Sequence, residues 1–189
     1  MKKMLFLFTV VSSLSLSAQH PVQNFTLPNV ADGTTLSLEA YSNTAGVALL
    51  FTSNNCPYDH YYLERIKGLV NTYQGKIQFL LINSYQEPAE SEEKMKQALG
   101  SWGISVPYLS DREQAAMTAV NAKKSPEVFL LKRDGKNHTI VYSGAIDDNP
   151  QVANAVVQYY LKSAIDKLVA GNKIDVTEVR AIGCTIRRK

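Results

Sequence analysis

The feature that most constrains the fold is a continuous apolar run, residues 46–52 (GVALLFT), followed by residues 53–57 (SNNCP). An apolar run without polar alternation is typical of a strand that is buried on both faces. Pro57 suits the first position of a helix, and apolar residues then recur at three-to-four spacing up to Gly75. A buried strand that leads directly into a helix indicates an α/β fold.

The alternation of strands and helices continues along the chain. The predicted elements are a hairpin within 25–38, a strand at 77–82, a helix at 88–99, a short extended link at 105–109, a helix from Asp111 to about Val120, an antiparallel pair at 126–132 and 139–142, and a long helix from 147–150 through Val169. This order predicts a three-layer α/β fold, in which a mixed central sheet is flanked by helices and preceded by an N-terminal β-hairpin.

The N-terminus has the pattern of a secretory signal. Two lysines precede an apolar stretch and a serine-rich segment that ends at Ala18, and the apolar stretch is too short for a membrane-spanning helix. We expect residues 1–18 to be a signal peptide and residues 19–189 to be one domain. The protein would then be exported, periplasmic or secreted, with no membrane attachment after the signal is removed.

Composition and charge indicate an ordinary globular domain and argue against a nucleic-acid-binding protein. Hydrophobic residues make up 45% and charged residues 20% of the 189 residues, as in ordinary globular domains. The net charge is only +3, and several of the basic residues lie at the two ends of the chain. The sequence therefore favours a single globular domain and gives little support for nucleic-acid binding.

Cys56 is the residue whose position most suggests chemistry. It follows the carboxyl end of the predicted strand and precedes a helix, whose N-terminal amides and dipole favour a thiolate. His60 lies one helical turn later and could approach the sulfur, although a solvated surface histidine is the simpler interpretation. Cys56 could instead be a small buried hydrophobic residue. A metal site at Cys56, Asp59 and His60 lacks a second ligand cluster, so no metal is expected.

Five segments together resemble a known family. They are residues 55–66 (NCPYDHYYLERI), 106–111 (VPYLSD), 125–130 (SPEVFL), 144–149 (GAIDDN) and 183–186 (GCTI). From about residue 25 to the C-terminus the chain resembles the thioredoxin-like proteins of the alkyl hydroperoxide reductase and thiol-specific antioxidant group, the redoxins.

The resemblance implies a thioredoxin-like fold and a set of site residues. Cys56 matches the nucleophilic cysteine, Pro126 matches a cis-proline that faces it, and Ser125 would lie beside the thiol. Ser53, Asn55 and Pro57 would complete the active-site loop, and His60 and Arg65 are candidate modulators of it. No cofactor is implied.

The sequence departs from the family pattern at three positions. Asp59 stands where a typical thioredoxin has its second cysteine, and Leu50 where many thioredoxins have a buried acid. Ser53 matches the hydroxyl residue of peroxiredoxins, but Leu49 replaces their proline. A local disulfide is therefore excluded, and neither thioredoxin nor peroxiredoxin activity follows directly.

Cys184 is the other cysteine of the chain and leaves three alternatives open. It could be a resolving cysteine on a flexible tail, one half of a permanent disulfide with Cys56, or a free thiol. An exported protein would make such a disulfide persistent.

The functional prediction is a thiol-dependent oxidoreductase or peroxiredoxin-like antioxidant protein that uses Cys56 as its nucleophile. Its expected partners are a protein disulfide or hydroperoxide substrate and an external thiol reductant. Two alternatives are a non-catalytic thioredoxin-fold binding module, with a peptide groove beside Pro126, and a monothiol disulfide carrier that needs Cys56 but not Cys184.

Overall fold

The computed structural model describes residues 21–41, 43–135 and 137–189. The predicted signal peptide, residues 1–18, lies outside these residues. The described strands and α-helices are β1 (Thr26–Pro28), β2 (Thr35–Ser37), β3 (Gly46–Phe51), α1 (Pro57–Thr72), β4 (Ile77–Asn83), α2 (Glu92–Trp102), β5 (Tyr108–Ser110), α3 (Ala115–Val120), β6 (Lys124–Ser125), β7 (Glu127–Asp134), β8 (Asn137–Gly144), α4 (Tyr160–Val169), β9 (Glu178–Val179) and β10 (Cys184–Thr185). Short 3-10 turns lie at η1 (Leu38–Ala40), η2 (Pro88–Glu90) and η3 (Ala153–Ala155).

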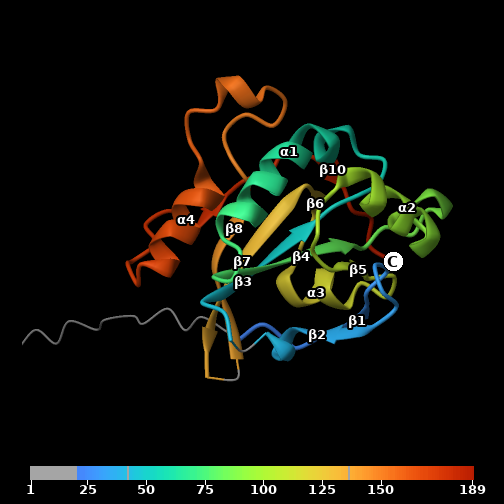
Figure 1. The fold of residues 1–189 in the computed structure, drawn as a ribbon, viewed down its shortest axis with the longest axis horizontal. Coiled ribbons are helices and arrows are strands. Elements are labelled where there is room, and N and C mark those ends of the chain that lie inside the picture. Colours follow the sequence, from blue (N-terminus) through green and yellow to red (C-terminus); the bar gives the residue numbers. More distant parts are fainter. Residues whose placement is uncertain (1–20, 42, 136) are drawn as a thin grey trace, which may run out of the picture.

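A mixed six-stranded sheet forms the centre of the molecule, in the order β5-β4-β3-β7-β8-β9. Strands β3, β4 and β5 are parallel, whereas β7 is antiparallel to both β3 and β8. Helices α1 and α4 lie on one side of the sheet, and α3 and the β1–β2 hairpin lie on the other (Figure 1). The predicted three-layer architecture is therefore confirmed.

The central strands bury both faces, as their uninterrupted apolar runs predict. In β3, Ala48 and Leu50 pack toward α1, α2 and α4, while Val47, Leu49 and Phe51 pack toward α3 and the N-terminal hairpin. All six residues of this strand are buried. This position fixes the carboxyl end of β3, from which the loop bearing Cys56 emerges.

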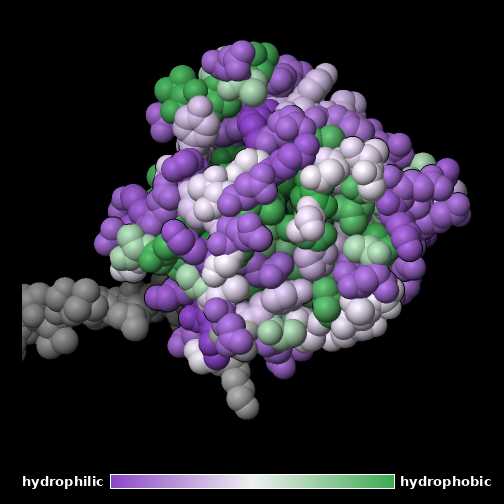
Figure 2. Space-filling model, in the orientation of Figure 1, coloured by the Kyte–Doolittle hydropathy of each residue, from purple (hydrophilic) through white to green (hydrophobic). Residues whose placement is uncertain are grey.

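The region before α4 differs from the prediction of one long helix beginning near Pro150. Helix α4 begins only at Tyr160, because polar side chains of the preceding segment form other contacts instead of capping a helix there. Asp147 pairs with Arg65 of α1, and the side chain of Asn149 accepts hydrogen bonds from the amides of Gln151 and Val152 in a local turn. The segment protrudes from the molecule, and apolar side chains are visible over it in Figure 2.

Two other helices are shorter or shifted relative to the prediction. The helix expected at 88–99 consists of the turn η2 and the separate helix α2, whose N-cap Ser91 accepts a hydrogen bond from the amide of Lys94. Asp111 caps α3 as expected, although it precedes the first helical residue, Ala115. Its carboxylate accepts hydrogen bonds from the amides of Ala116 and Met117. No helix within the described residues has the length and apolar character needed to cross a membrane.

The C-terminal segment returns across the molecule to the site and is not a loose tail. Strand β9 adds to the edge of the central sheet parallel to β8, and β10 pairs antiparallel with β6. Ile186, directly after β10, is buried in the core beneath α3. These contacts hold Cys184 in a fixed place.

Candidate active site

Cys56 occupies the N-cap of α1, directly beyond the carboxyl end of β3, with Pro57 at the first helical position. Its Sγ lies 3.3 Å from the carbonyl oxygen of Ser125. The Ser125–Pro126 peptide bond is cis, as the resemblance implies. The predicted strand-to-helix junction therefore brings the sulfur and the proline loop together.

A disulfide joins Cys56 to Cys184, across a sequence separation of 128 residues and with the two Cα atoms 6.0 Å apart. Cys184 lies opposite Ser125 in the β10–β6 pair. Gly183 allows this approach, because a Cβ at that position would lie 2.1 Å from the carbonyl oxygen of Ser125. The structure shows the two cysteines paired, as both the resolving and the permanent-disulfide alternatives require, and it excludes a free thiol for this state.

Cys56 is deeply buried, although the sequence places it in a loop at the start of a helix. Only 2% of the residue is exposed, because the active-site loop and β10 cover it. Cys184 is partly exposed and shares with Cys56 the lining of a depression of about 210 Å³ that includes Tyr85 and Glu87. Solvent thus reaches the disulfide from the side of Cys184.

Glu90 of η2 holds the loop that precedes Cys56. Its buried carboxylate accepts hydrogen bonds from the Ser53 hydroxyl at 2.6 Å and from the amides of Asn54 at 2.8 Å and Asn55 at 3.2 Å. The side chain of Asn83, at the end of β4, donates to the same carboxylate at 2.7 Å. Four donors on one carboxylate fix the loop conformation and hence the place of the sulfur.

Asp59 lies in the first turn of α1 and is 1% exposed. Burial raises the pKa of this carboxyl from 3.8 to about 8, against the opposing effects of Ser125, Thr52 and the Ser53 amide, which donates to Oδ2 at 3.2 Å. Its other oxygen, Oδ1, forms no well-aligned hydrogen bond within the described residues. Asp59 is therefore largely protonated at neutral pH. The buried acid that many thioredoxins have at the position of Leu50 in β3 is absent, but α1 supplies a buried acid, Asp59.

Two hydroxyl groups connect this acid with the cysteines. The Tyr85 hydroxyl lies 2.8 Å from the Ser125 hydroxyl and donates to the carbonyl oxygen of Cys184 at 3.2 Å. Burial raises the pKa of Tyr85 well above its usual value. Tyr85 therefore remains a neutral donor that helps to hold β10 over the site.

The two candidate modulators, His60 and Arg65, form their hydrogen bonds with groups other than the Cys56 sulfur. Nε2 of His60 donates to the carbonyl oxygen of Asn54 at 2.9 Å, so the ring stabilises the loop and is not directed at Cys56 as a partner. Arg65 binds the carboxylate of Asp147 at 2.7 and 2.9 Å and lies 3.7 Å from the centre of the Tyr62 ring. Its role is to connect α1 with the segment before α4.

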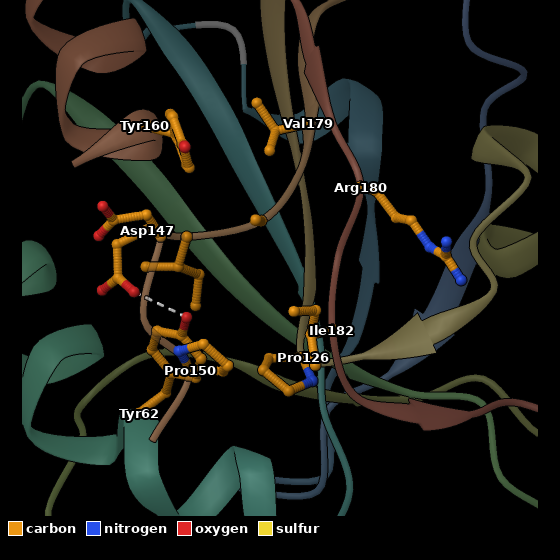
Figure 3. A pocket seen from close by; sticks show the side chains of 11 residues that line it. Tyr62, Pro126, Asp147, Pro150, Tyr160, Val179, Arg180 and Ile182 are labelled. Atoms are coloured by element: carbon orange, nitrogen blue, oxygen red, sulfur yellow. Dashed lines mark hydrogen bonds between the residues drawn. The ribbon is translucent and has the colours of Figure 1, made fainter. Parts of the chain in front are cut away.

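A pocket of about 200 Å³ lies on the other side of Pro126 (Figure 3). Tyr62 and Asp147, joined by a hydrogen bond of 2.8 Å, form part of its wall, and Ile182 of the C-terminal segment forms another. The side chain of Arg180 extends away from it. Beside Pro126 the structure thus has a pocket, and Ile182 of the C-terminal segment lines it.

Sequence reasoning missed Glu90, Asp59 and Tyr85 as members of the site. Asp59 carried a signal, since it stands in the place of a thioredoxin cysteine on a helical turn that faces the sheet. Glu90 and Tyr85 follow β4 and carry no local pattern that connects them with Cys56. Within the described part of the chain, no group of three or more potential ligands could hold a metal ion.

The comparisons with known proteins agree with this geometry. The Redoxin family model matches residues 17–159. The chain belongs to the redoxin family. No significant match was found among curated proteins.

Solved structures similar to this redoxin include two of nearly the same length. A hypothetical protein from Sinorhizobium meliloti 1021 is 27% identical, with a TM-score of 0.81, over 93% of this chain and 96% of that one. An uncharacterized conserved protein from Geobacillus kaustophilus is 28% identical, with a TM-score of 0.82, over 97% and 98%. A secreted disulfide oxidoreductase of Mycobacterium tuberculosis is 13% identical, covers 75% and 94%, and with a TM-score of 0.54 shows similarity of fold alone.

Proposed function

We propose that this redoxin is an exported thiol–disulfide oxidoreductase whose redox couple is formed by Cys56 and Cys184. The observation that carries the proposal is the disulfide that joins the helix N-cap to a strand paired beside the cis-proline. Cys184 thereby takes the part that a nearby second cysteine plays in a typical thioredoxin, and Asp59 occupies the vacated place. The partners are a protein disulfide or dithiol and an external thiol reductant or oxidant.

Disulfide exchange is favoured over reduction of a hydroperoxide. The hydroxyl of Ser53 and the amides of Asn54 and Asn55, which surround the start of the loop, are already bound to Glu90. Cys56 is also covered by β10. Few free donors therefore remain beside the sulfur to bind a peroxide. Export rests on the N-terminal signal pattern and agrees with a persistent disulfide.

The test compares the protein with its Cys56→Ser and Cys184→Ser variants in reduction and oxidation of a disulfide-containing protein and in peroxide consumption. Wild type should exchange with glutathione redox buffers and catalyse thiol–disulfide exchange, and each variant should lose at least about tenfold in rate because the two-electron couple needs both sulfurs. Peroxide consumption should be weak in all three proteins.

Two outcomes would replace the proposal. If Cys184→Ser keeps full activity, the protein is a monothiol carrier that uses Cys56 alone. If both variants keep the biological role and the disulfide of wild type stays closed in reducing glutathione buffers, the disulfide is structural and the protein is a non-catalytic module. An active Cys56→Ser variant would contradict a redox couple that includes Cys56.

A further inference from the structure

We propose that Cys184 is the sulfur that exchanges with the partner, and that Cys56 is the buried thiolate that leaves and later closes the disulfide again. This inference rests on the proposed function and deepens it. It reverses the order implied by the family resemblance, in which the cysteine at the helix start meets the partner first.

Access to the two sulfurs is the first observation. An incoming thiolate must contact the sulfur that it attacks. Cys56 is 2% exposed, enclosed by its own loop and by β10, whereas Cys184 is partly exposed. Both cysteines line the depression beside the disulfide, together with Tyr85 and the exposed Glu87, but Cys184 is the more exposed of the two. A partner therefore reaches Cys184 before Cys56.

The stability of the departing sulfur is the second observation. A thiolate leaves faster when the pKa of its thiol is lower. Cys56 lies at the N-cap of α1, a helix of 16 residues whose N-terminus favours negative charge. Cys184 itself belongs to a short strand and not to the start of a helix. Attack on Cys184 thus expels the sulfur that better carries the charge.

The anchoring of the C-terminal segment is the third observation. Beyond Cys184, Ile186 is buried and its amide donates to the carbonyl oxygen of Lys123 at 3.0 Å. The side chain of Gln114 donates to the carbonyl oxygen of Arg187 at 2.7 Å. Before Cys184, β9 is paired with β8. A partner attached to Cys184 would therefore stay within reach of Cys56.

The steps balance for a partner dithiol that is oxidised. One partner thiolate attacks Sγ of Cys184, so that a mixed disulfide forms, the Cys56–Cys184 bond breaks and its electron pair remains on Cys56. The second partner thiolate then attacks the partner sulfur of the mixed disulfide and releases Cys184 as a thiolate. In total, the partner loses two electrons and two protons, which the protein gains as two thiols. A partner disulfide is reduced by the same steps in reverse, with Cys56 attacking the mixed disulfide.

The experiment locates the first adduct on the protein. Oxidised protein is mixed briefly with 2-mercaptoethanol, free thiols are blocked with iodoacetamide, and the tryptic peptides are measured by mass spectrometry. Cleavage after Arg180 and Arg187 separates Cys184, in residues 181–187, from Cys56, whose peptide ends at Arg65. We expect the mercaptoethanol adduct on Cys184 and the iodoacetamide label on Cys56, with at least about tenfold preference.

The control uses the same protein unfolded in guanidinium, where burial and the helix start are lost. There the adduct should divide about evenly between the two cysteines. An even division or an excess on Cys56 in the folded protein would overturn the inference, while the proposed function would survive if thiol exchange still occurs. A tenfold preference that persists after unfolding would also overturn it, because the fold would not be the cause. A disulfide that does not react with the thiol would instead refute the proposed function.

Discussion

Two carboxyl groups from different elements lie against the loop that carries Cys56, and their environments differ. Glu90 accepts hydrogen bonds from four donors. Asp59 is buried with few donors, so its neutral form is favoured. The Glu90 side chain thus holds the loop, while a carboxyl group whose protonated form is favoured lies in the first turn after the cysteine. The raised pKa of Asp59 should be visible in the way stability depends on pH.

Asp59→Asn should remove a pH dependence of stability. The pKa of Asp59 is about 8 in the folded protein and near 3.8 when unfolded, so the folded state binds more protons between these values. The free energy of unfolding of wild type therefore falls as pH rises from about 4 to 8, and the variant should lack this decrease, which amounts to about 4 kcal/mol between pH 5 and pH 9. Urea unfolding at pH 5 and pH 9 measures it. Glu64→Gln, at an exposed carboxyl of α1, is the control, and identical pH profiles for wild type and Asp59→Asn would contradict the prediction.

At the scale of elements, the site depends on how closely β10 approaches β6. The antiparallel pair contains only two residues on each strand, Cys184 opposite Ser125 and Thr185 opposite Lys124. Such a short pair is marginal alone and needs support from tertiary contacts. Gly183 supplies the close approach, and the Tyr85 hydroxyl adds a hydrogen bond to the strand.

Gly183→Ala should separate β10 from β6. The added Cβ would lie 2.1 Å from the carbonyl oxygen of Ser125 and 2.6 Å from its carbon, so the backbone must shift. We expect the oxidised protein to lose about 1–3 kcal/mol of stability, as in other overpacked sites, and its disulfide to be reduced faster by dithiothreitol. Thermal unfolding and the rate of reduction measure both effects.

The matched control for this change is Gly100→Ala in α2, where no atom lies within 4 Å of the added Cβ. That variant should be as stable as wild type or more stable, by up to about 1 kcal/mol, because alanine favours a helix. If Gly183→Ala has the same thermal stability and the same rate of reduction as wild type, β10 can shift away from β6 without destabilising the protein, and the prediction is wrong.

At the scale of the whole molecule, the disulfide closes the chain around nearly the entire domain. It joins the start of α1 to the end of the polypeptide, 128 residues later, and so encloses the helices and most of the central sheet. A crosslink over so long a loop restricts the unfolded chain strongly. Redox state and global stability are therefore coupled in this protein.

Reduction of the disulfide should lower the free energy of unfolding by roughly 4–5 kcal/mol, from the loss of loop closure. Urea denaturation of the oxidised and the reduced protein gives the difference directly. The double variant Cys56→Ser, Cys184→Ser should resemble the reduced protein and should not respond to reductant. Equal stability of the oxidised and reduced forms would mean that the unfolded chain is already restricted in other ways.

The sequence by itself determined those features that depend on near neighbours. The apolar run of β3, the helix that starts at Pro57 and the hairpin around Asp32 and Gly33 were all predicted, because periodicity, caps and turn residues act over a few positions. The family resemblance added the cis bond before Pro126. The start predicted for the last helix, at residues 147–150, was wrong, because Asp147 is used in a distant ion pair with Arg65, whereas the predicted end of this helix at Val169 is confirmed.

Only the tertiary structure decided which groups meet at the sulfur. The pairing of Cys56 with Cys184, the carboxylate of Glu90 on the active-site loop and the burial of Asp59 join segments that are separated along the chain or face the core. Such contacts depend on the register of the strands and the path of the C-terminal segment. No local pattern records them, because a long-range contact is fixed by the packing of the whole domain.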